Sequence, residues 1–391
     1  MIATQQFIRL GLERSAFLTA VELSRDQMHS MGTPDGATLL PTFQLELLPA
    51  GDGDCMLLSW GRDGKLSHMV VDGGRAGAYP HLRKRLSMIA QAGEVLELYV
   101  LTHIDADHIE GALSYLRDIN RPIIPREVWY NGQYEMAPAG KRSMAQGDAF
   151  SIALKALGWP LNTTFSDGVA RIGAAALPVE MAGLCLTLLS PDERHLASLG
   201  VNWSKWYQQQ TLRPRAGARG AKKPAVPTPL IVEDLLSPVP ADTELPNGSS
   251  IAFLAEWEGH RILFGADAHP DMLAASLEPM AQAEGGRYRV DLLKASHHGS
   301  AKNTSRRLME LMDCRRMAIS TNGNIHGHPD PQAIALFLHY GPKGPKTLYF
   351  NYVTPWTRPW MAPDVAERYG YSVHAPTDRQ GAITINLLAE I

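Results

Sequence analysis

Two histidines and two aspartates lie close together in the segment THIDADHIEG at residues 102–111: His103, Asp105, Asp107 and His108. An apolar run, VLELYVL, leads into them. Imidazole and carboxylate groups are the ligands that divalent cations take from proteins. A tight loop after a rigid strand would turn alternate side chains toward one cation, and the adjacent pair would serve a second. The alternative is a solvated loop whose acids cap the next helix, but four such residues at the end of a buried strand favour a metal site.

Other ionisable side chains also follow apolar runs. Asp72 ends the string VVD, Asp267 follows ILFGA, and four histidines lie in DLLKASHHGS and NIHGHPDP. These histidines are His297, His298, His326 and His328. Taken singly, each residue has a structural interpretation as a turn residue, a capping residue or a buried histidine. Together they fall where strands give way to loops, which is where functional sites are usually built. Several carboxylates crowded there need cations or protons to neutralise them.

The apolar runs predict the elements that position these groups. FQLELLPA, CMLLSW and VLELYVLTH predict strands, whereas YPHLRKRLSMIAQAG and EGALSYLRDI predict helices. Strands alternating with helices indicate an α/β layered fold. SSIAFLAEW and HRILFGADA, joined by EGH, predict a tight hairpin. The tail GYSVHAPTDRQGAITINLL predicts a final hairpin with residues 378–381 at its turn.

Composition limits the kind of protein. The 391 residues are 45% apolar with a net charge of −3, enough for a large core and without a general attraction to nucleic acid or membrane. Three distant cysteines without a CxxC pair indicate reduced thiols and a cytoplasmic protein. No run approaches the roughly 18 apolar residues of a membrane span.

The domain organisation is predicted as a polar lead-in over residues 1–40 and one domain over residues 41–391. An insertion at about 193–245 begins with helical spacing and continues into a basic, acid-free stretch. That stretch would either follow a nucleic-acid backbone or be a disordered linker.

Eight strings of the sequence, taken in order, resemble the metallo-β-lactamase superfamily and, within it, the soluble relatives of the hydrolase domain of ComEC-type DNA-uptake proteins. The strings are GDGDCMLLSW, MVVDGG, LTHIDADHIEG, NGSSIAFL, ILFGADA, DLLKASHHGS, NIHGHPDP and TDRQGAI. With the segments that flank them, the resemblance covers residues 43–387. The resemblance implies a metallo-β-lactamase-like four-layer αβ/βα sandwich with two mixed β-sheets. It also implies a dinuclear metal centre at the edges of the sheets.

The same resemblance implies a ligand set for two cations. His103 and Asp105 would hold one cation, and Asp107 with His108 would hold the other. Asp267 would bridge the two.

The resemblance also assigns the residues around these ligands. His297 would complete the second site, in preference to His298, because it directly follows the serine that ends the strand. Asp72 would support the metal loop from behind.

Two positions depart from the pattern of the family. The motif HxHxDH has Asp105 in place of its second histidine. The histidine that elsewhere precedes a strand of the SSIAFL type is absent, with Asn247 or Ser249 nearby. The first site is therefore expected to be rich in oxygen and poor in nitrogen, which shifts preference from zinc toward manganese and leaves both metals open.

A pair of cations lowers the pKa of a shared water and stabilises the entering and leaving oxygens of an in-line displacement. Together with this chemistry, the resemblance to ComEC-type hydrolase domains implies a metal-dependent hydrolase, a phosphodiesterase or nuclease, whose substrate could include nucleic acid. The candidate catalytic residues are Asp107, Lys294 and His328. Lys294 and Ser300 would bind a phosphate oxygen, although a structural role fits Lys294 equally well. His328 would protonate the leaving group or contact the transition state.

Two other hypotheses about the function stay open. The same site would suit hydrolysis of a small ester, lactone or amide, since this architecture serves many chemistries. A non-catalytic binding protein that keeps its metal for stability is the third.

Overall fold

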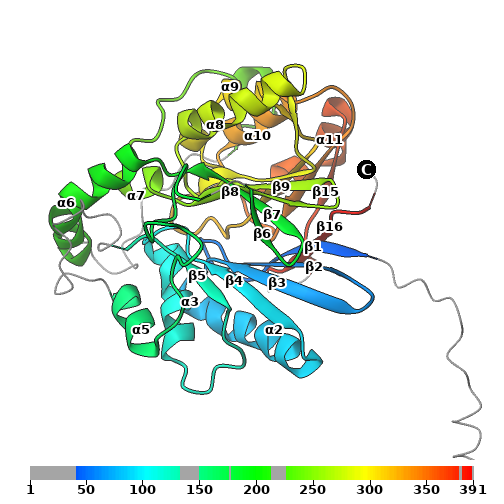
Figure 1. Cartoon of the computed structure of the whole chain (residues 1–391). Helices are drawn as coiled ribbons and strands as arrows, with labels where there is room; N and C mark the ends of the chain where they lie inside the picture. The colour runs from blue at the N-terminus through cyan, green and yellow to red at the C-terminus, as the bar shows by residue number, and fades with distance from the viewer. Residues whose placement is uncertain (1–40, 133–148, 176–177, 213–225, 378–380, 390–391) are drawn as a thin grey trace, which may run out of the picture. The chain divides into compact units, whose positions relative to one another are not determined.

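Two mixed β-sheets form the centre of the computed structural model, which describes residues 41–132, 149–175, 178–212, 226–377 and 381–389 (Figure 1). The first sheet has the order β16-β1-β2-β3-β4-β5. Its pairs are antiparallel from β16 to β3 and parallel from β3 to β5. Its strands are β1 (Thr42–Leu47), β2 (Met56–Arg62), β3 (Lys65–Val71), β4 (Val95–Val100), β5 (Glu127–Trp129) and β16 (Ile383–Asn386).

The second sheet has the order β15-β14-β13-β11-β9-β8-β7-β6. Pairs from β15 to β9 are parallel, and pairs from β9 to β6 are antiparallel. Its strands are β6 (Val179–Met181), β7 (Leu184–Ser190), β8 (Ala252–Trp257), β9 (His260–Phe264), β11 (Leu292–Lys294), β13 (Arg316–Ile319), β14 (Lys346–Phe350) and β15 (Tyr371–His374). A separate short pair joins β10 (Tyr288–Arg289) to β12 (Met312–Asp313).

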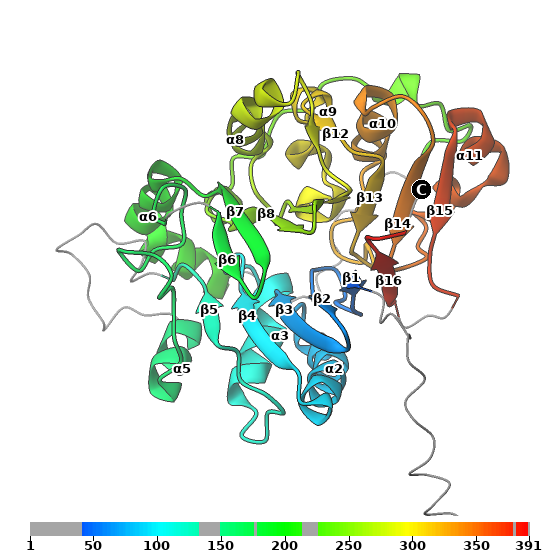
Figure 2. The ribbon, with the colours of Figure 1, turned by 45° about the vertical axis from the view of Figure 1, so that its right-hand side comes forward.

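Helices cover the outer face of each sheet (Figures 1 and 2). The first sheet carries α2 (Tyr79–Ala92), α3 (Ala106–Arg117) and α5 (Ala149–Leu157). The second carries α8 (Pro270–Ala283), α9 (Arg306–Glu310), α10 (Pro331–Tyr340) and α11 (Pro363–Tyr369), while α6 (Glu193–Leu212) lies beside α7 (Leu245–Gly248). The layers run helix, sheet, sheet, helix, so the expected α/β fold with two mixed sheets is confirmed.

The order of layers follows from the periodicity of the apolar residues. In β1, Phe43, Leu45 and Leu47 alternate with polar residues and are fully buried in the core between the sheets. In α2, Leu82 and Leu86 share a face that packs on the outer side of the first sheet. Each sheet is therefore apolar on both faces, as a four-layer arrangement requires.

The two predicted hairpins had different outcomes. The turn at Glu258 and Gly259 joins β8 to β9 as predicted, with φ of 49° and 78°. The predicted C-terminal hairpin is wrong, because β15 pairs with β14 in the second sheet and β16 pairs with β1 in the first. The partner of β16 lies more than 300 residues earlier, so no local pattern indicates it.

The remaining sequence expectations concern chain organisation. From Pro41 onward the chain forms one compact unit. Residues 1–40 and 213–225, which contain the polar lead-in and most of the basic stretch, lie outside the described residues. In the described ranges no helix is both long and apolar enough to cross a bilayer, and the three cysteines are unpaired.

Candidate metal centre

The candidate site residues gather where the carboxyl ends of strands from both sheets meet. Residues 103–108 follow β4, Asp267 follows β9, and His297 and His298 form the turn after β11. Neighbouring parallel strands end at the same edge of a sheet, so the loops that follow them converge.

Close backbone contacts fix the first turn of α3, which contains Asp107 and His108. A Cβ atom on Gly53 would lie 1.7 Å from the carbonyl oxygen of Asp107, and one on Gly111 would lie 1.9 Å from the carbonyl oxygen of Gly73. The Gly73 amide also donates to the carbonyl oxygen of His108 at 2.9 Å. Glycine is required at these positions because two backbones touch there.

Four imidazoles at the site each have Nδ1 beside an oxygen atom. The partners are Thr102 Oγ1 for His103 at 3.0 Å, Asp72 Oδ2 for His108 at 2.8 Å, Asn303 Oδ1 for His297 at 3.0 Å and the Ser320 carbonyl for His298 at 3.0 Å. Carboxylate, carbonyl and amide oxygens only accept hydrogen bonds, and the Thr102 hydroxyl already donates to Asp72. Nδ1 is therefore the protonated nitrogen of each neutral ring, and Nε2 keeps its lone pair.

All four Nε2 atoms face the carboxylate of Asp267. Oδ2 lies 3.6 Å from His103 Nε2 and 3.7 Å from His297 Nε2. Oδ1 lies 3.5 Å from His108 Nε2 and 3.9 Å from His298 Nε2. Asp267 is only 2% exposed, so one buried carboxylate divides the imidazoles into two pairs.

Two further carboxylates complete the two groups. Asp105 Oδ2 lies 3.9 Å from His103 Nε2. Asp107 Oδ2 lies 3.2 Å from His298 Nε2 and 3.9 Å from His108 Nε2. We define the first half of the site as His103, Asp105 and His297. The second half is Asp107, His108 and His298, and Asp267 lies between the two halves.

The donor atoms fit divalent cations. Nε2 of His103, His108 and His298 and Oδ1 of Asp267 are buried without a hydrogen-bond partner among the described residues. Buried polar atoms normally have partners. Their separations of 3.5 to 3.9 Å are close to the spacing of about 3.4 Å between ligands that lie about 2.1 Å from a tetrahedral ion. Two imidazoles, one aspartate and the shared Asp267 are thus available in each half.

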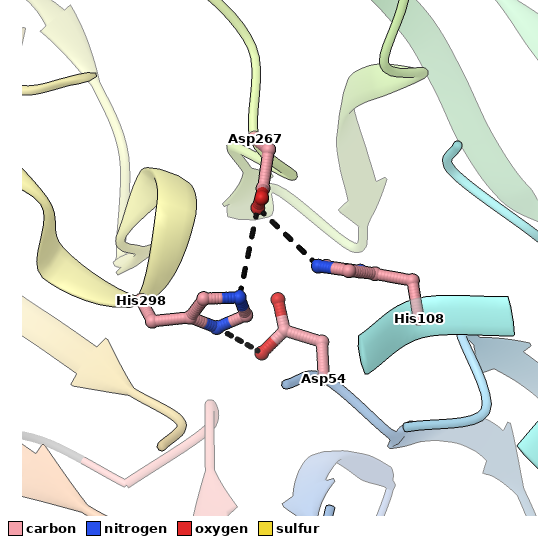
Figure 3. Close-up of side chains that lie close together, drawn as sticks. All are labelled: Asp54, His108, Asp267 and His298. Atoms are coloured by element: carbon pink, nitrogen blue, oxygen red, sulfur yellow. Dashed lines mark ion pairs between the residues drawn. The ribbon is translucent and has the colours of Figure 1, made fainter. Parts of the chain in front are cut away.

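A fourth aspartate lies beside the second half. The potential ligand atoms of Asp54, His108, Asp267 and His298 all lie within 4.8 Å of one another, and all four residues are buried. Figure 3 shows Asp267 between the two rings, with Asp54 beside the Nδ1 side of His298. Asp54 immediately precedes Cys55 and β2 and is fully buried.

The two imidazoles of the metal-free first half differ: the pKa of His103 is lowered, whereas that of His297 is raised, because the charge of Asp267 and the bond to Asp242 outweigh its burial. Burial, together with the nearby charge of His108, lowers the pKa of His103 to about 3. Desolvation and the charges of Asp107 and Asp267 raise the pKa of Asp105, although 33% of its side chain is exposed. The charges of His108 and His297 oppose this rise only in part, so negative charge is still crowded around Asp105.

The metal-free second half favours positive charge. Burial alone would lower the pKa of His298, but the charges of Asp54 and Asp267 outweigh it and raise that pKa to about 10. The pKa of His108 is also raised, because the charges of Asp267 and Asp72 outweigh its burial. Protons on these rings occupy the position that cations would otherwise take.

The two adjacent histidines differ from the expectation. His298, rather than His297, lies with Asp107 in the second half, and His297 lies with His103 in the first. Both residues have left-handed backbone conformations, with φ of 46° and 54°, which turn their side chains to opposite sides. The first half therefore contains two imidazoles and is not poor in nitrogen, contrary to the inference from Asp105.

Lys294 and Ser300 are not placed to bind a substrate phosphate. Lys294 Nζ donates to Asp54 Oδ2 at 2.8 Å and to the Ala295 carbonyl at 3.1 Å, and it has no exposed surface. Ser300 is 3% exposed, and its hydroxyl accepts from the amide of Lys302 in the next turn. Both side chains are used in holding the loop around the site.

Three other predicted residues surround the ligands. Asp72 lies behind His108 and is fully buried. Asn247 Nδ2 lies 3.3 Å from His297 Nδ1. The ring of His328 lies 5.4 Å from the ring of His297 and 6.0 Å from that of His326, on the side of the first half.

Sequence reasoning missed Asp54, Asp242 and Asn303. Asp242 Oδ2 accepts from Asn303 Nδ2 at 2.9 Å and lies 3.5 Å from His297 Nδ1, so these two residues hold the His297 ring. The string GDGDC contained a signal for Asp54, since it puts two acids before an apolar strand. Asp242 lies in a proline-rich stretch with no such signal.

No family model and no curated protein matches the sequence. Solved structures do match. The metallo-β-lactamase fold protein YhfI from Bacillus subtilis is 11% identical, with 88% of this chain and 99% of that chain covered and a TM-score of 0.35. The short form of human tRNase Z is 10% identical, with 88% and 100% covered and a TM-score of 0.37.

A third similar structure is MEM-A1, a subclass B3 metallo-β-lactamase from a soil metagenome library. It is 12% identical, with 67% of this chain and 78% of that chain covered and a TM-score of 0.29. Since these TM-scores lie below 0.5, the fold description rests on the strand order and the helical layers themselves.

Proposed function

We propose that this chain is a metal-dependent hydrolase with a dinuclear centre, and that its substrate is a phosphodiester. The observation that supports the proposal is the position of Asp267. Each of its two oxygens faces a pair of Nε2 atoms, and each pair has its own aspartate. A site that needed only charge balance would not require four imidazoles with the same tautomer.

The residues of the chain have distinct tasks in this proposal. The first half would hold one divalent cation, the second half would hold another, and Asp267 would contact both. When bound, such a pair supplies a water of lowered pKa and stabilises negative charge on the entering and leaving oxygens. Two imidazoles and two carboxylates in each half suit zinc, and the carboxylates also accept manganese.

A phosphodiester suits the site because its transition state gathers negative charge, which cations stabilise more effectively than a covalent nucleophile does. His328, whose ring lies 5.4 Å from that of His297, would give a proton to the leaving oxygen. The resemblance to ComEC-type hydrolase domains supports the same substrate class. Nucleic acid is the substrate that we favour within it.

Metal analysis joined to hydrolysis assays tests the proposal. The full-length protein should contain two zinc or manganese ions per chain. It should cleave bis-p-nitrophenyl phosphate, and DNA or RNA should be tested in single- and double-stranded form. His108→Ala should abolish cleavage.

Three other outcomes would count against the proposal. Turnover of nitrocefin or a lactone without phosphodiester cleavage would favour a hydrolase of small esters or amides. A metal-loaded protein that is inactive on every substrate would favour a non-catalytic binding protein. Failure to bind any divalent cation would exclude the metal centre.

A further inference from the structure

Asp54 and Lys294 form an ion pair inside the protein. Lys294 Nζ lies 2.8 Å from Asp54 Oδ2, and neither side chain has exposed surface. The residues come from different sheets, since Asp54 precedes β2 and Lys294 ends β11. The desolvation of two buried charges offsets most or all of their attraction, so stability alone is a weak reason for such a pair.

The other oxygen of Asp54 points to a role. Oδ1 lies 3.4 Å from His298 Nδ1 and is buried without a hydrogen-bond partner of its own. Nδ1 also lies 3.0 Å from the carbonyl oxygen of Ser320. Both oxygens favour a hydrogen on Nδ1, so Nε2, which lies 3.2 Å from Asp107 Oδ2, is the nitrogen available to a cation.

His108, in the same half, also has a carboxylate behind its ring, at hydrogen-bond distance. Its Nδ1 lies 2.8 Å from Asp72 Oδ2, again with both side chains fully buried. A carboxylate behind a ligating imidazole orients the ring and makes its other nitrogen a better ligand. Asp72 has Thr102 as a hydrogen-bond donor, whereas Asp54 has the full positive charge of Lys294.

We propose that Asp54 is a positioning residue that holds His298 in its ligating orientation, and that Lys294 keeps the Asp54 carboxylate behind the ring. Without Lys294, the Asp54 carboxylate would lie buried without a counter-ion and within reach of a cation at the second half. The Asp54–Lys294 pair would then determine the orientation of His298 and the number of ligands in the second half. This inference rests on the proposed metal centre.

Three variants of the full-length protein test the inference: Asp54→Asn, Lys294→Met and the double variant. Lys346→Met is the matched control, because Lys346 is a lysine of the same sheet that is 6% exposed and begins β14. The readouts are zinc affinity, from competition with a chromogenic chelator, and the visible absorption spectrum after loading with cobalt(II). Melting curves of the metal-free proteins establish that each variant folds.

The expected results differ between variants. Asp54→Asn should weaken the binding of one of the two zinc ions by about 10–100-fold. Its cobalt spectrum should show an unchanged coordination number. Lys294→Met should change the cobalt spectrum, as the released carboxylate enters the ligand set. The double variant should return the spectrum to that of Asp54→Asn, and it remains a test should Asp54→Asn fail to fold around an unpaired Lys294. Lys346→Met should bind like the wild type.

Two results would overturn the inference while leaving the metal centre intact. One is wild-type affinity for both zinc ions in Asp54→Asn and in the double variant. The other is a cobalt spectrum that shows one metal ligand fewer in either of these variants, which would make Asp54 a ligand rather than a positioning residue. A wild-type protein that binds no zinc would instead remove the proposed function, and the inference with it.

Discussion

His297 and His298 are adjacent in the chain, yet their rings lie 5.8 Å apart at 83° to each other and face opposite oxygens of one carboxylate. Left-handed backbone at both residues produces this divergence. Non-glycine residues in that conformation cost on the order of 1 kcal/mol each. Ala266 and Asp72, also close to the site, share the conformation, so four of the eight non-glycine residues with positive φ in the described ranges lie at the site.

Single replacements of these histidines should remove different ions. His297→Ala should lose the cation of the first half and His298→Ala that of the second, each leaving one ion per chain. Hydrolysis should fall by about 100-fold or more in both, since loss of a mere supporting partner already costs about 10–100-fold. Elemental analysis with cobalt spectra distinguishes the two sites. His339→Ala, an exposed histidine of α10, is the control, and two retained ions in either variant would contradict the ligand assignment.

Chelation should destabilise the fold. Ions that bind only the folded chain stabilise it by about 4 kcal/mol at a free concentration of about 1,000 times Kd. Dialysis against a chelator should therefore lower the melting temperature, and zinc or manganese should restore it. Asp267→Asn removes the carboxylate shared by both halves, so its melting temperature should not respond to added zinc. A wild-type melting curve that is indifferent to chelator would argue against a resident metal.

Metal affinity should depend on pH differently in the two halves. In the metal-free protein the pKa of His298 is raised to about 10 and that of His103 is lowered to about 3. Near neutral pH a cation must therefore displace a proton from His298 but none from His103. The affinity of the second half should rise by about tenfold per pH unit for each displaced proton between about pH 6.5 and 9, and fall equally on acidification.

Calorimetric titration at several pH values in buffers of different ionisation enthalpy counts the protons released. The first half should release protons from His297 and Asp105, whose pKa values are both raised, and none from His103. Absence of proton release when the second half is filled near neutral pH would contradict the raised pKa of His298. His297→Ala and His298→Ala allow each site to be titrated alone.

Gly53→Ala should displace α3. Its methyl group would lie 1.7 Å from the Asp107 carbonyl oxygen, so the loop or the helix must move, at a cost of about 1–3 kcal/mol or more. Urea unfolding should show this loss, and the second-half cation should bind more weakly. Gly77→Ala is the control, because a Cβ there meets no atom within 4 Å. Unchanged stability and metal content in Gly53→Ala would show that the contact relaxes freely.

Sequence patterns predicted the local parts of this structure well. The alternation in β1, the helical spacing of α2 and the turn at Glu258 and Gly259 are each set by neighbouring residues, and each was found as predicted. The cluster at residues 103–108 was visible because its ligand types are crowded within one loop. Local periodicity and composition suffice for features of this kind.

Features that depend on distant partners were not predicted. The choice between His297 and His298 depends on backbone handedness, which their identities do not indicate. The position of Asp54 depends on its ion pair with Lys294, 240 positions away. That of Asp242 depends on its hydrogen bond with Asn303. The C-terminal hairpin failed for the same reason, since β16 finds its partner in β1.

The pairing of β16 with β1 has a consequence for biosynthesis. Gln44 lies opposite Asn386, so one edge of the first sheet stays open on the ribosome until β16 has emerged. During that interval the apolar side of β1 would be a target for chaperones or for aggregation. Because β1 and β16 lie side by side, the fold should tolerate a circular permutation in which a linker joins these two strands and new termini are introduced in another loop.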